Sequence, residues 1–240
     1  MADQDIESIK GIVDPIEGWL SGHEAELLYH SARCCTAKGV IVEIGSYKGK
    51  STICLAKGSQ RGKNIKIYAI DPHEGYTEYA GAKTPSNTFA EFSRNIEKAR
   101  VADLIVPIVD TSRHAALSFH EPIELLFIDG SHEYSAVKED FHDWVPKVID
   151  GGMVVFHDTI GYEGPRRVVN ELIYRSGQFK DIKLIDEITL AVKSKNITAA
   201  DRLKNFNMLI VKKLSEGAVR IKIPKAIRGW GKKILKKAQD

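Results

Sequence analysis

Hydrophobic and polar residues alternate along this chain with two different periods, and the change comes after residue 38. Before it, apolar positions such as Ile9 and Val13 recur at helical spacing, with breaks near Pro15 and Gly22. After it, short β-branched apolar runs are separated by longer amphipathic stretches. The pattern predicts a helical cap over residues 1–38, followed by an α/β domain.

Seven short apolar runs are predicted to be strands. They are Val40–Ile44, Ile65–Ile70, Leu104–Val109, Ile123–Ile128, Met153–Phe156, Ile182–Ile185 and Thr189–Val192. The first five are nearly continuous apolar runs, which is typical of strands covered on both faces. The last two are joined by Asp186-Glu187, which predicts a hairpin.

Amphipathic stretches between these runs are predicted to be helices. They are Ser51–Lys57, Asn87–Ala99, Arg113–Phe119, Ser135–Val148 and Pro165–Arg175. Alternation of strands and helices predicts βαβ units in an open, mostly parallel sheet. In such sheets ligands bind beyond the carboxyl ends of the strands. The residues that directly follow each strand are therefore the candidates for a functional site.

The first strand leads into a turn with two glycines. Its sequence is Glu43-Ile44-Gly45-Ser46-Tyr47-Lys48-Gly49-Lys50-Ser51. Gly45 allows a tight turn and the close approach of a ligand to the backbone, and Ser51 begins a helix whose backbone N–H groups are free. The dinucleotide-binding fingerprint would have a glycine where Tyr47 stands. The turn by itself is compatible with a nucleotide-like ligand or with a purely structural role.

Acidic residues follow the second and third strands. Asp71, in Asp71-Pro72-His73, could accept hydrogen bonds from both hydroxyls of a ribose or simply open a turn, and we favour the ligand. Asp110, followed by Thr111, could accept from the amine of an adenine or cap the next helix. The residues leave both roles of Asp110 open.

The fourth and fifth strands end in the densest group of polar side chains. Asp129 and His132 follow the fourth strand, and His157 and Asp158 follow the fifth. Adjacent parallel strands would bring the four side chains to one edge of the sheet. Carboxylates beside imidazoles suit either a hard divalent cation or general-base catalysis.

Taken together, these motifs resemble the class I S-adenosylmethionine-dependent methyltransferases. The segments that carry the resemblance are Val42–Gly49, Ile70–Pro72, Phe127–Tyr134, Gly151-Gly152 and Phe156–Asp158. The resemblance covers residues 38–193 and is greatest to the branch that contains cephalosporin-biosynthesis and macrolide-sugar O-methyltransferases. It implies a Rossmann-like, seven-stranded, mostly parallel sheet in the order 3-2-1-4-5-7-6, with helices on both faces.

The resemblance also implies roles for individual residues around the cofactor S-adenosylmethionine. Glu43 and Gly45 would line its methionine and ribose part, Asp71 would hold the ribose, and Asp110 would lie near the adenine. The predicted cofactor site is completed by Ser46, Tyr47, Ser51, Pro72, His73, Thr111 and Asp129.

In the sugar-modifying members of this branch, the positions of Asp129, His157 and Asp158 bind Mg²⁺, and that of His132 is the base. This chain departs from the family pattern at Tyr47, where a third glycine is usual, and at His157, where several metal-binding relatives have an acid. Imidazole is a poorer ligand for Mg²⁺ than carboxylate. The expected cation is therefore Mg²⁺ or the softer Mn²⁺.

The predicted function is transfer of a methyl group to a hydroxyl of a small-molecule or saccharide acceptor, with Asp129 and His132 as catalytic residues. One alternative is an NAD-dependent oxidoreductase, which the absence of G-x-G-x-x-G and the group of His and Asp residues argue against. The other is a non-catalytic nucleotide-binding module.

Charge divides the chain into two parts. From Lys212 to Asp240 there are ten basic and two acidic residues, a net charge of +8, which leaves 25 basic and 30 acidic residues elsewhere, a net charge of −5. We therefore expect three parts: a helical cap at 1–38, a methyltransferase domain at 39–194, and a basic, largely helical extension at 195–240.

The end of this extension has a second amphipathic pattern. After Pro224, apolar positions recur at helical spacing with Lys and Arg between them; they are Ala226, Ile227, Trp230, Ile234 and Ala238. Such a basic helix either lies on an anionic membrane surface or docks on its own body or on a partner subunit of a homo-oligomer. Nucleic acid is not an expected partner, because aromatic residues are not interleaved with these charges.

Location follows from two further features of the sequence. No apolar run approaches the roughly 20 residues that a membrane span needs. The first residues are acidic and lack the basic-then-apolar order of a signal peptide. We expect a cytoplasmic protein, or one peripheral at the inner face of the membrane.

Overall fold

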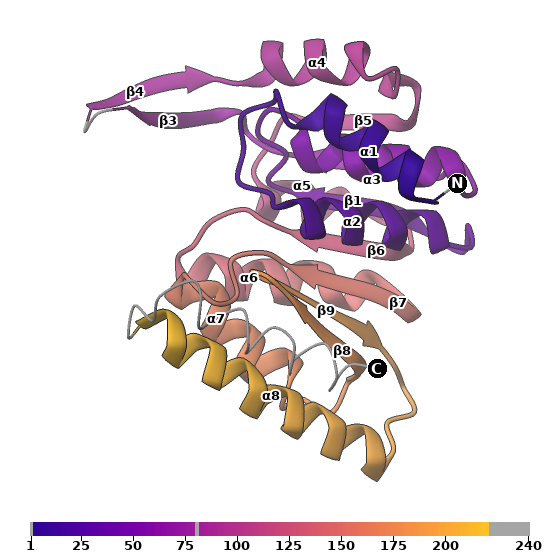
Figure 1. The fold of residues 1–240 in the computed structure, drawn as a ribbon, viewed down its shortest axis with the longest axis vertical. Coiled ribbons are helices and arrows are strands. Elements are labelled where there is room, and N and C mark those ends of the chain that lie inside the picture. Colours follow the sequence, from indigo (N-terminus) through magenta and orange to yellow (C-terminus); the bar gives the residue numbers. More distant parts are fainter. Residues whose placement is uncertain (1, 80–81, 221–240) are drawn as a thin grey trace.

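A seven-stranded sheet is the framework of the protein, for which a computed structural model describes residues 2–79 and 82–220. The strand order is β5-β2-β1-β6-β7-β9-β8, which corresponds to 3-2-1-4-5-7-6 when the sheet's own strands are counted along the chain. The predicted Rossmann-like order is thus confirmed (Figure 1).

Each predicted apolar run overlaps a strand, although β7 and β8 begin five and three residues before the runs that predicted them. Five strands pair in parallel, and they are β1 (Val40–Ile44), β2 (Ile67–Ile70), β5 (Ile105–Ile108), β6 (Ile123–Ile128) and β7 (Val148–Phe156). The predicted hairpin consists of β8 (Phe179–Ile185) and β9 (Ile188–Lys193), and β9 runs antiparallel to β7.

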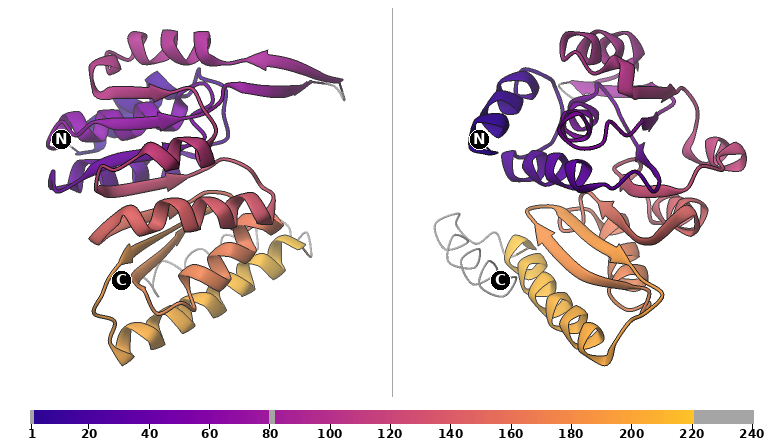
Figure 2. Two further views of the ribbon diagram at one scale, coloured as in Figure 1. Left: turned by 180° about the vertical axis from the view of Figure 1, so that it is seen from behind. Right: turned by 90° about the vertical axis from the view of Figure 1, so that its right-hand side faces the viewer.

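Helices cover both faces of the sheet (Figure 2). The buried residues of α1 (Ala2–Val13), α2 (Gly22–Cys34), α3 (Lys50–Arg61) and α4 (Phe89–Lys98) belong to one apolar cluster. Those of α5 (Ser112–Ser118), α6 (Tyr134–Trp144) and α7 (Glu163–Val168) belong to a second cluster. The helical cap predicted for residues 1–38 therefore consists of α1 and α2, whose buried apolar residues share a core with those of α3.

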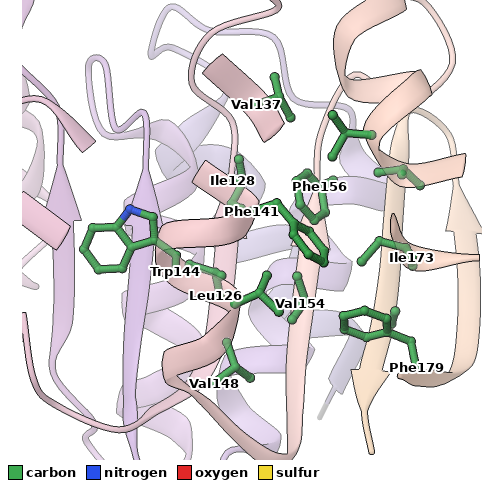
Figure 3. Packing of buried hydrophobic residues seen from close by; sticks show 14 of the residues in the cluster. Leu126, Ile128, Val137, Phe141, Trp144, Val148, Val154, Phe156, Ile173 and Phe179 are labelled. Carbon is green, nitrogen blue, oxygen red and sulfur yellow. The ribbon is translucent and has the colours of Figure 1, made fainter. Parts of the chain in front are cut away.

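Every residue of β6 is buried, because its two faces contribute to different clusters. Leu125 and Phe127 belong to the first, and Leu126 and Ile128 to the second, as the alternation of side chains along a strand requires. In the second cluster Leu126 and Ile128 pack near Phe141 of α6 (Figure 3). This double burial explains the continuous apolar run in the sequence.

Two predicted helices are shorter than the patterns that predicted them. The helix expected at Ser135–Val148 ends at Trp144 and is followed by a 3-10 turn, η2 (Val145–Lys147), that contains a proline near its start. The helix expected at Pro165–Arg175 changes after Val168 into a π-helical turn, η3 (Val169–Ile173). A further 3-10 turn, η1 (Ala102–Leu104), precedes β5.

A hairpin between β2 and α4 was not expected from the sequence. It is formed by β3 (Glu74–Tyr79) and β4 (Ala82–Asn87), which pair with each other and project from the body of the molecule (Figure 1). Its residues are mostly polar or small and lack the apolar alternation that predicts a strand.

The last described element is a long helix, α8 (Ala199–Arg220), which packs beside β8. Its Asn205 side chain is buried and donates a hydrogen bond to the Phe179 carbonyl oxygen at 2.7 Å. The amphipathic stretch predicted after Pro224 lies outside the described residues. Within the described part of the chain, no helix is both long and apolar enough to span a bilayer.

Candidate active site

The turn after β1 brings the backbones of β1 and β6 into very close approach. Gly45 has φ +87°, and a Cβ added to it would lie 2.1 Å from the Asp129 carbonyl oxygen. Only glycine fits both the left-handed conformation and this separation. The next residue, Ser46, is 2% exposed and lines the cleft, and its hydroxyl has no hydrogen-bond partner among the described residues.

Asp71, at the end of β2, joins this turn to the following one. Its carboxylate accepts a hydrogen bond from the Tyr47 N–H at 2.8 Å and another from the His73 N–H at 2.6 Å. Tyr47 takes the left-handed conformation, φ 43°, at the position where the fingerprint has glycine. Each Asp71 oxygen keeps a further lone pair, because a carboxylate can accept about four hydrogen bonds.

Glu43 lies behind the cleft. It is fully buried, and its two oxygens accept hydrogen bonds of 2.5 Å from the Ser51 and Thr52 hydroxyls. Burial raises the pKa of Glu43 to about 8, against the effect of the two hydroxyl donors, and the charge of Asp129 adds to the rise. Ser51 lines the cleft, whereas Glu43 holds the first turn of α3. Any contribution of Glu43 to a cofactor site would therefore be indirect.

His73 is buried between aromatic rings at the end of β2. Its Nδ1 lies 2.9 Å from the Thr88 hydroxyl, and its ring centroid lies 5.2 Å from those of Phe89 and Phe92. Burial lowers the pKa of His73, and Asp71 opposes this effect. Its Nε2 has no hydrogen-bond partner among the described residues, and the residue lines the cleft, as the more exposed Pro72 also does.

The four polar residues after β6 and β7 do meet at one edge. Nε2 of His132 lies 2.8 Å from an Asp158 oxygen, and Nδ1 of His157 lies 3.3 Å from both Asp129 and Asp158. The hydrogen bond to Asp158 raises the pKa of His132, although partial burial opposes it. Burial raises the pKa of Asp129, whereas for Asp158 the two imidazoles outweigh burial and lower the pKa.

A fifth member of this group comes from the helical cap and was missed by the sequence analysis. Glu24 of α2 is 3% exposed, and one of its oxygens lies 3.5 Å from Nε2 of His157. The motif Ser21-x-x-Glu24 indicates a capping box, which the structure contains, but no pattern indicates that the same carboxylate faces His157. Glu24 also accepts a hydrogen bond from the Glu187 N–H at 2.8 Å.

His157 is therefore enclosed by three carboxylates. Burial disfavours its charged form, but Asp129, Asp158 and Glu24 outweigh this effect and raise the pKa of His157 far above its ordinary value. Neither ring nitrogen has the alignment of a hydrogen bond, so the contacts are ion pairs. A buried imidazolium stabilises these carboxylates.

Within the described residues, one group has the spacing of metal ligands. Ligand atoms of Asp129, His132 and Asp158 all lie within 4.8 Å of one another. The group contains His132 in place of the predicted ligand His157, which is 5% exposed.

Asp110 does not point towards the other candidates. Its carboxylate contacts Nδ1 of His114 at 2.5 Å, and this hydrogen bond lowers the pKa of Asp110. Thr111 caps α5 by accepting from the His114 N–H at 3.3 Å, and it lines the cleft where Asp110 does not. The cap of α5 is therefore Thr111, and Asp110 forms a local pair with His114 instead.

All these turns border one cleft of about 1040 Å³. Its walls include Gly45, Ser46, Asp71, Asp129 and His132. Two aromatic residues also line it and are largely open to solvent. They are Trp19, 79% exposed, and Tyr162, 49% exposed, whose ring lies 3.9 Å from that of His132.

One known protein family matches the part of the chain that forms much of this cleft. Residues 42–159, from β1 to just beyond β7, match a family described as a methyltransferase domain. The matched residues include the turn after β1, the whole of β6 and β7, and the four polar residues that follow these two strands, Asp129, His132, His157 and Asp158.

Two uncharacterised proteins are similar in sequence. One, from Sinorhizobium fredii, is 30% identical over 157 residues, which are 61% of this chain and 16% of that protein. The other, from Acanthamoeba polyphaga mimivirus, is 30% identical over 150 residues, 59% of this chain and 63% of that protein. The chain thus spans less than two thirds of the length of either relative.

Solved structures of O-methyltransferases have a fold similar to that of this chain. The O-methyltransferase TomG of Streptomyces achromogenes, crystallised in complex with S-adenosylmethionine, has a TM-score of 0.56 and 18% identity. The similarity covers 80% of this chain and 90% of TomG.

Proposed function

We propose that this protein is an S-adenosylmethionine-dependent O-methyltransferase acting on a hydroxyl of a small-molecule or saccharide acceptor. One observation carries the proposal: the His132–Asp158 pair, 2.8 Å apart, borders the same cleft as the Gly45 turn of the methyltransferase domain. A nucleotide turn alone serves many reactions, whereas a paired imidazole next to it supplies a base.

The cleft has groups that fit S-adenosylmethionine. Gly45 lines the cleft, and the buried Ser46 hydroxyl lacks a partner that a ligand could supply. Asp71 keeps lone pairs for ribose hydroxyls while its N–H contacts hold it in place. When bound, S-adenosylmethionine supplies an electrophilic methyl group on a sulfonium.

His132 is suited to take the proton of the acceptor. If Nε2 donates its hydrogen to Asp158, Nδ1 is the nitrogen that can accept a proton, and the carboxylate stabilises the imidazolium that results. The acceptor oxygen gains the methyl group, its proton passes to His132, and S-adenosylhomocysteine leaves. Most of the acceleration would come from holding the acceptor oxygen and the methyl group in line.

Exposed aromatic rings support an acceptor with a flat or apolar face. Trp19 comes from the cap and Tyr162 from the segment after β7, and both line the cleft without being covered. Aromatic rings pack against the apolar face of a sugar or of another small ring. The saccharide class of acceptor remains part of the proposal on this ground.

A divalent cation is a further part of the proposal. The carboxylates of Asp129 and Asp158 would hold it, and it would orient the acceptor hydroxyl and lower its pKa. His157 is in direct contact with both carboxylates, and it would become a third ligand only by losing the proton of its ion-paired imidazole. A mixed carboxylate and imidazole set fits Mn²⁺ better than Mg²⁺.

Cofactor choice is tested by titration calorimetry of the full chain with S-adenosylhomocysteine and, separately, with NADH. We expect micromolar-range binding of S-adenosylhomocysteine and none of NADH. Asp71→Asn should weaken the binding by about tenfold or more, because it replaces one acceptor oxygen by a donor beside the ribose. Binding of NADH alone would instead support the oxidoreductase alternative, and binding of neither would support a module without this cofactor.

Removal of metal tests the cation. Turnover should fall on dialysis against EDTA and return on addition of Mn²⁺, and more weakly with Mg²⁺, because the site contains imidazole. Metal content is measured by mass spectrometry on the same samples. Full turnover in protein shown to be metal-free would refute the cation and leave the His132 proposal intact.

A further inference from the structure

Helix α8 has an apolar stripe on the side that faces away from the body. Leu203, Phe206, Ile210 and Leu214 are 62%, 59%, 44% and 70% exposed. Their spacing of three and four residues places them along one side of the helix. Four buried residues form the opposite side: Asn205, Met208, Leu209 and Lys212.

Basic residues flank this stripe. Arg202, Lys204 and Lys213 are exposed, and at 100° per residue they lie on either side of the apolar positions. Both acids of α8 are occupied: Asp201 accepts from Thr198, and Glu216 pairs with the buried Lys212 at 2.6 Å. The exposed side of the described part of α8 is thus apolar in the middle and positive at its edges.

Chain beyond the described residues adds charge of the same sign. Residues 221–240 follow α8 directly and contain seven Lys or Arg and one acid. The positive charge is therefore concentrated at the C-terminal end of the sequence, while the rest of the chain carries a net negative charge.

We propose that the exposed side of α8 docks this protein on an anionic lipid surface. An apolar stripe flanked by Lys and Arg is the pattern of a helix that lies in the plane of a membrane interface, with its side chains among the lipids and its cations at the headgroups. The basic residues that follow in the sequence would strengthen the same contact, because each cation near an anionic surface is attracted to it.

Two other occupants of the apolar stripe are a second copy of this chain and residues 221–240, and charge favours an anionic lipid surface over both. A second copy of this chain packed on the stripe would bring the Lys and Arg flanks of two helices together without acids to pair them. Residues 221–240, folded back on the stripe, would do the same with their own cations. An anionic surface supplies the missing opposite charge.

The test is co-sedimentation of the full chain with two kinds of vesicle, phosphatidylcholine alone and phosphatidylcholine mixed with phosphatidylglycerol. We expect binding to the mixed vesicles that weakens as salt is raised. The triple variant Leu203→Ser/Phe206→Ser/Leu214→Ser should bind these vesicles at least about tenfold more weakly, because three apolar side chains no longer enter the interface.

A matched control is Leu117→Ser, which removes an equally exposed leucine, 75% exposed, from α5. α5 follows β5, at the edge of the sheet opposite to β8. The control should bind like the original protein, and circular dichroism should show the same helix content in all three proteins. Equal binding by the triple variant, or no preference for the anionic vesicles, would overturn the proposal. So would sedimentation equilibrium that shows a dimer dependent on the stripe.

Discussion

Replacement of His132 by alanine is expected to reduce kcat by about 10²–10⁴-fold, the usual contribution of a general base. The dissociation constant for S-adenosylhomocysteine should stay close to that of the original protein, because the proposed cofactor-binding residues Gly45, Ser46 and Asp71 are unchanged. Turnover is measured with the acceptor once it is found by screening hydroxyl compounds, and binding is measured by calorimetry.

His142→Ala is the matched control for this experiment. His142 is exposed in the last turn of α6, the helix that follows His132, and it does not line the cleft. It should leave both kcat and cofactor binding unchanged. Loss of S-adenosylhomocysteine binding in His132→Ala would mean that His132 supports the cofactor site instead of acting as the base, and unchanged kcat would exclude it as the base.

Replacement of Gly45 by alanine is expected to destabilise the protein by about 3 kcal/mol or more and to abolish cofactor binding. The added Cβ would lie 2.1 Å from the Asp129 carbonyl oxygen, so the backbone of β6 must move. Asp129 is part of the group with His132 and Asp158, and its displacement would disturb the catalytic edge as well. Thermal and denaturant unfolding give the loss of stability.

Gly151→Ala separates the collision from the backbone conformation. Gly151 has φ +82°, close to the +87° of Gly45, but a Cβ added there meets nothing within 4 Å. Its cost should be only that of a left-handed alanine, about 1–2 kcal/mol, with cofactor binding retained. Equal losses in the two variants would show that the approach of β1 to β6 has no special importance.

Local patterns predicted much of the fold because each follows from chemistry along a few residues. The nearly continuous apolar run Ile123–Ile128 indicated a doubly covered strand, and β6 has these bounds. Breaks at Pro15 and Gly22 indicated two helices in the cap, which the structure contains. The hairpin at β3 and β4 was missed, because its polar residues have no face to bury and thus no period to detect.

Contacts between distant segments explain what the patterns could not show at the site. Glu43 and Asp110 were placed at the right strand ends, but one is held by Ser51 and Thr52 and the other by His114. Position along a strand does not fix the direction of a side chain that has a nearby partner. Glu24 comes from the first turn of α2. It reaches His157 because α2 packs on α3, which brings the start of α2 close to the carboxyl end of β7.

By itself, the sequence determined the alternating strands and helices of the sheet and the glycine turn after β1. It also determined that four His and Asp residues follow β6 and β7. These depend on periodicity and on the rule that carboxyl ends of parallel strands share one edge. Only the tertiary structure decided that His157 is enclosed by three carboxylates while His132 stays at the open cleft. Burial and charge differ between two imidazoles that the sequence presents alike, and these properties arise only when distant segments pack together.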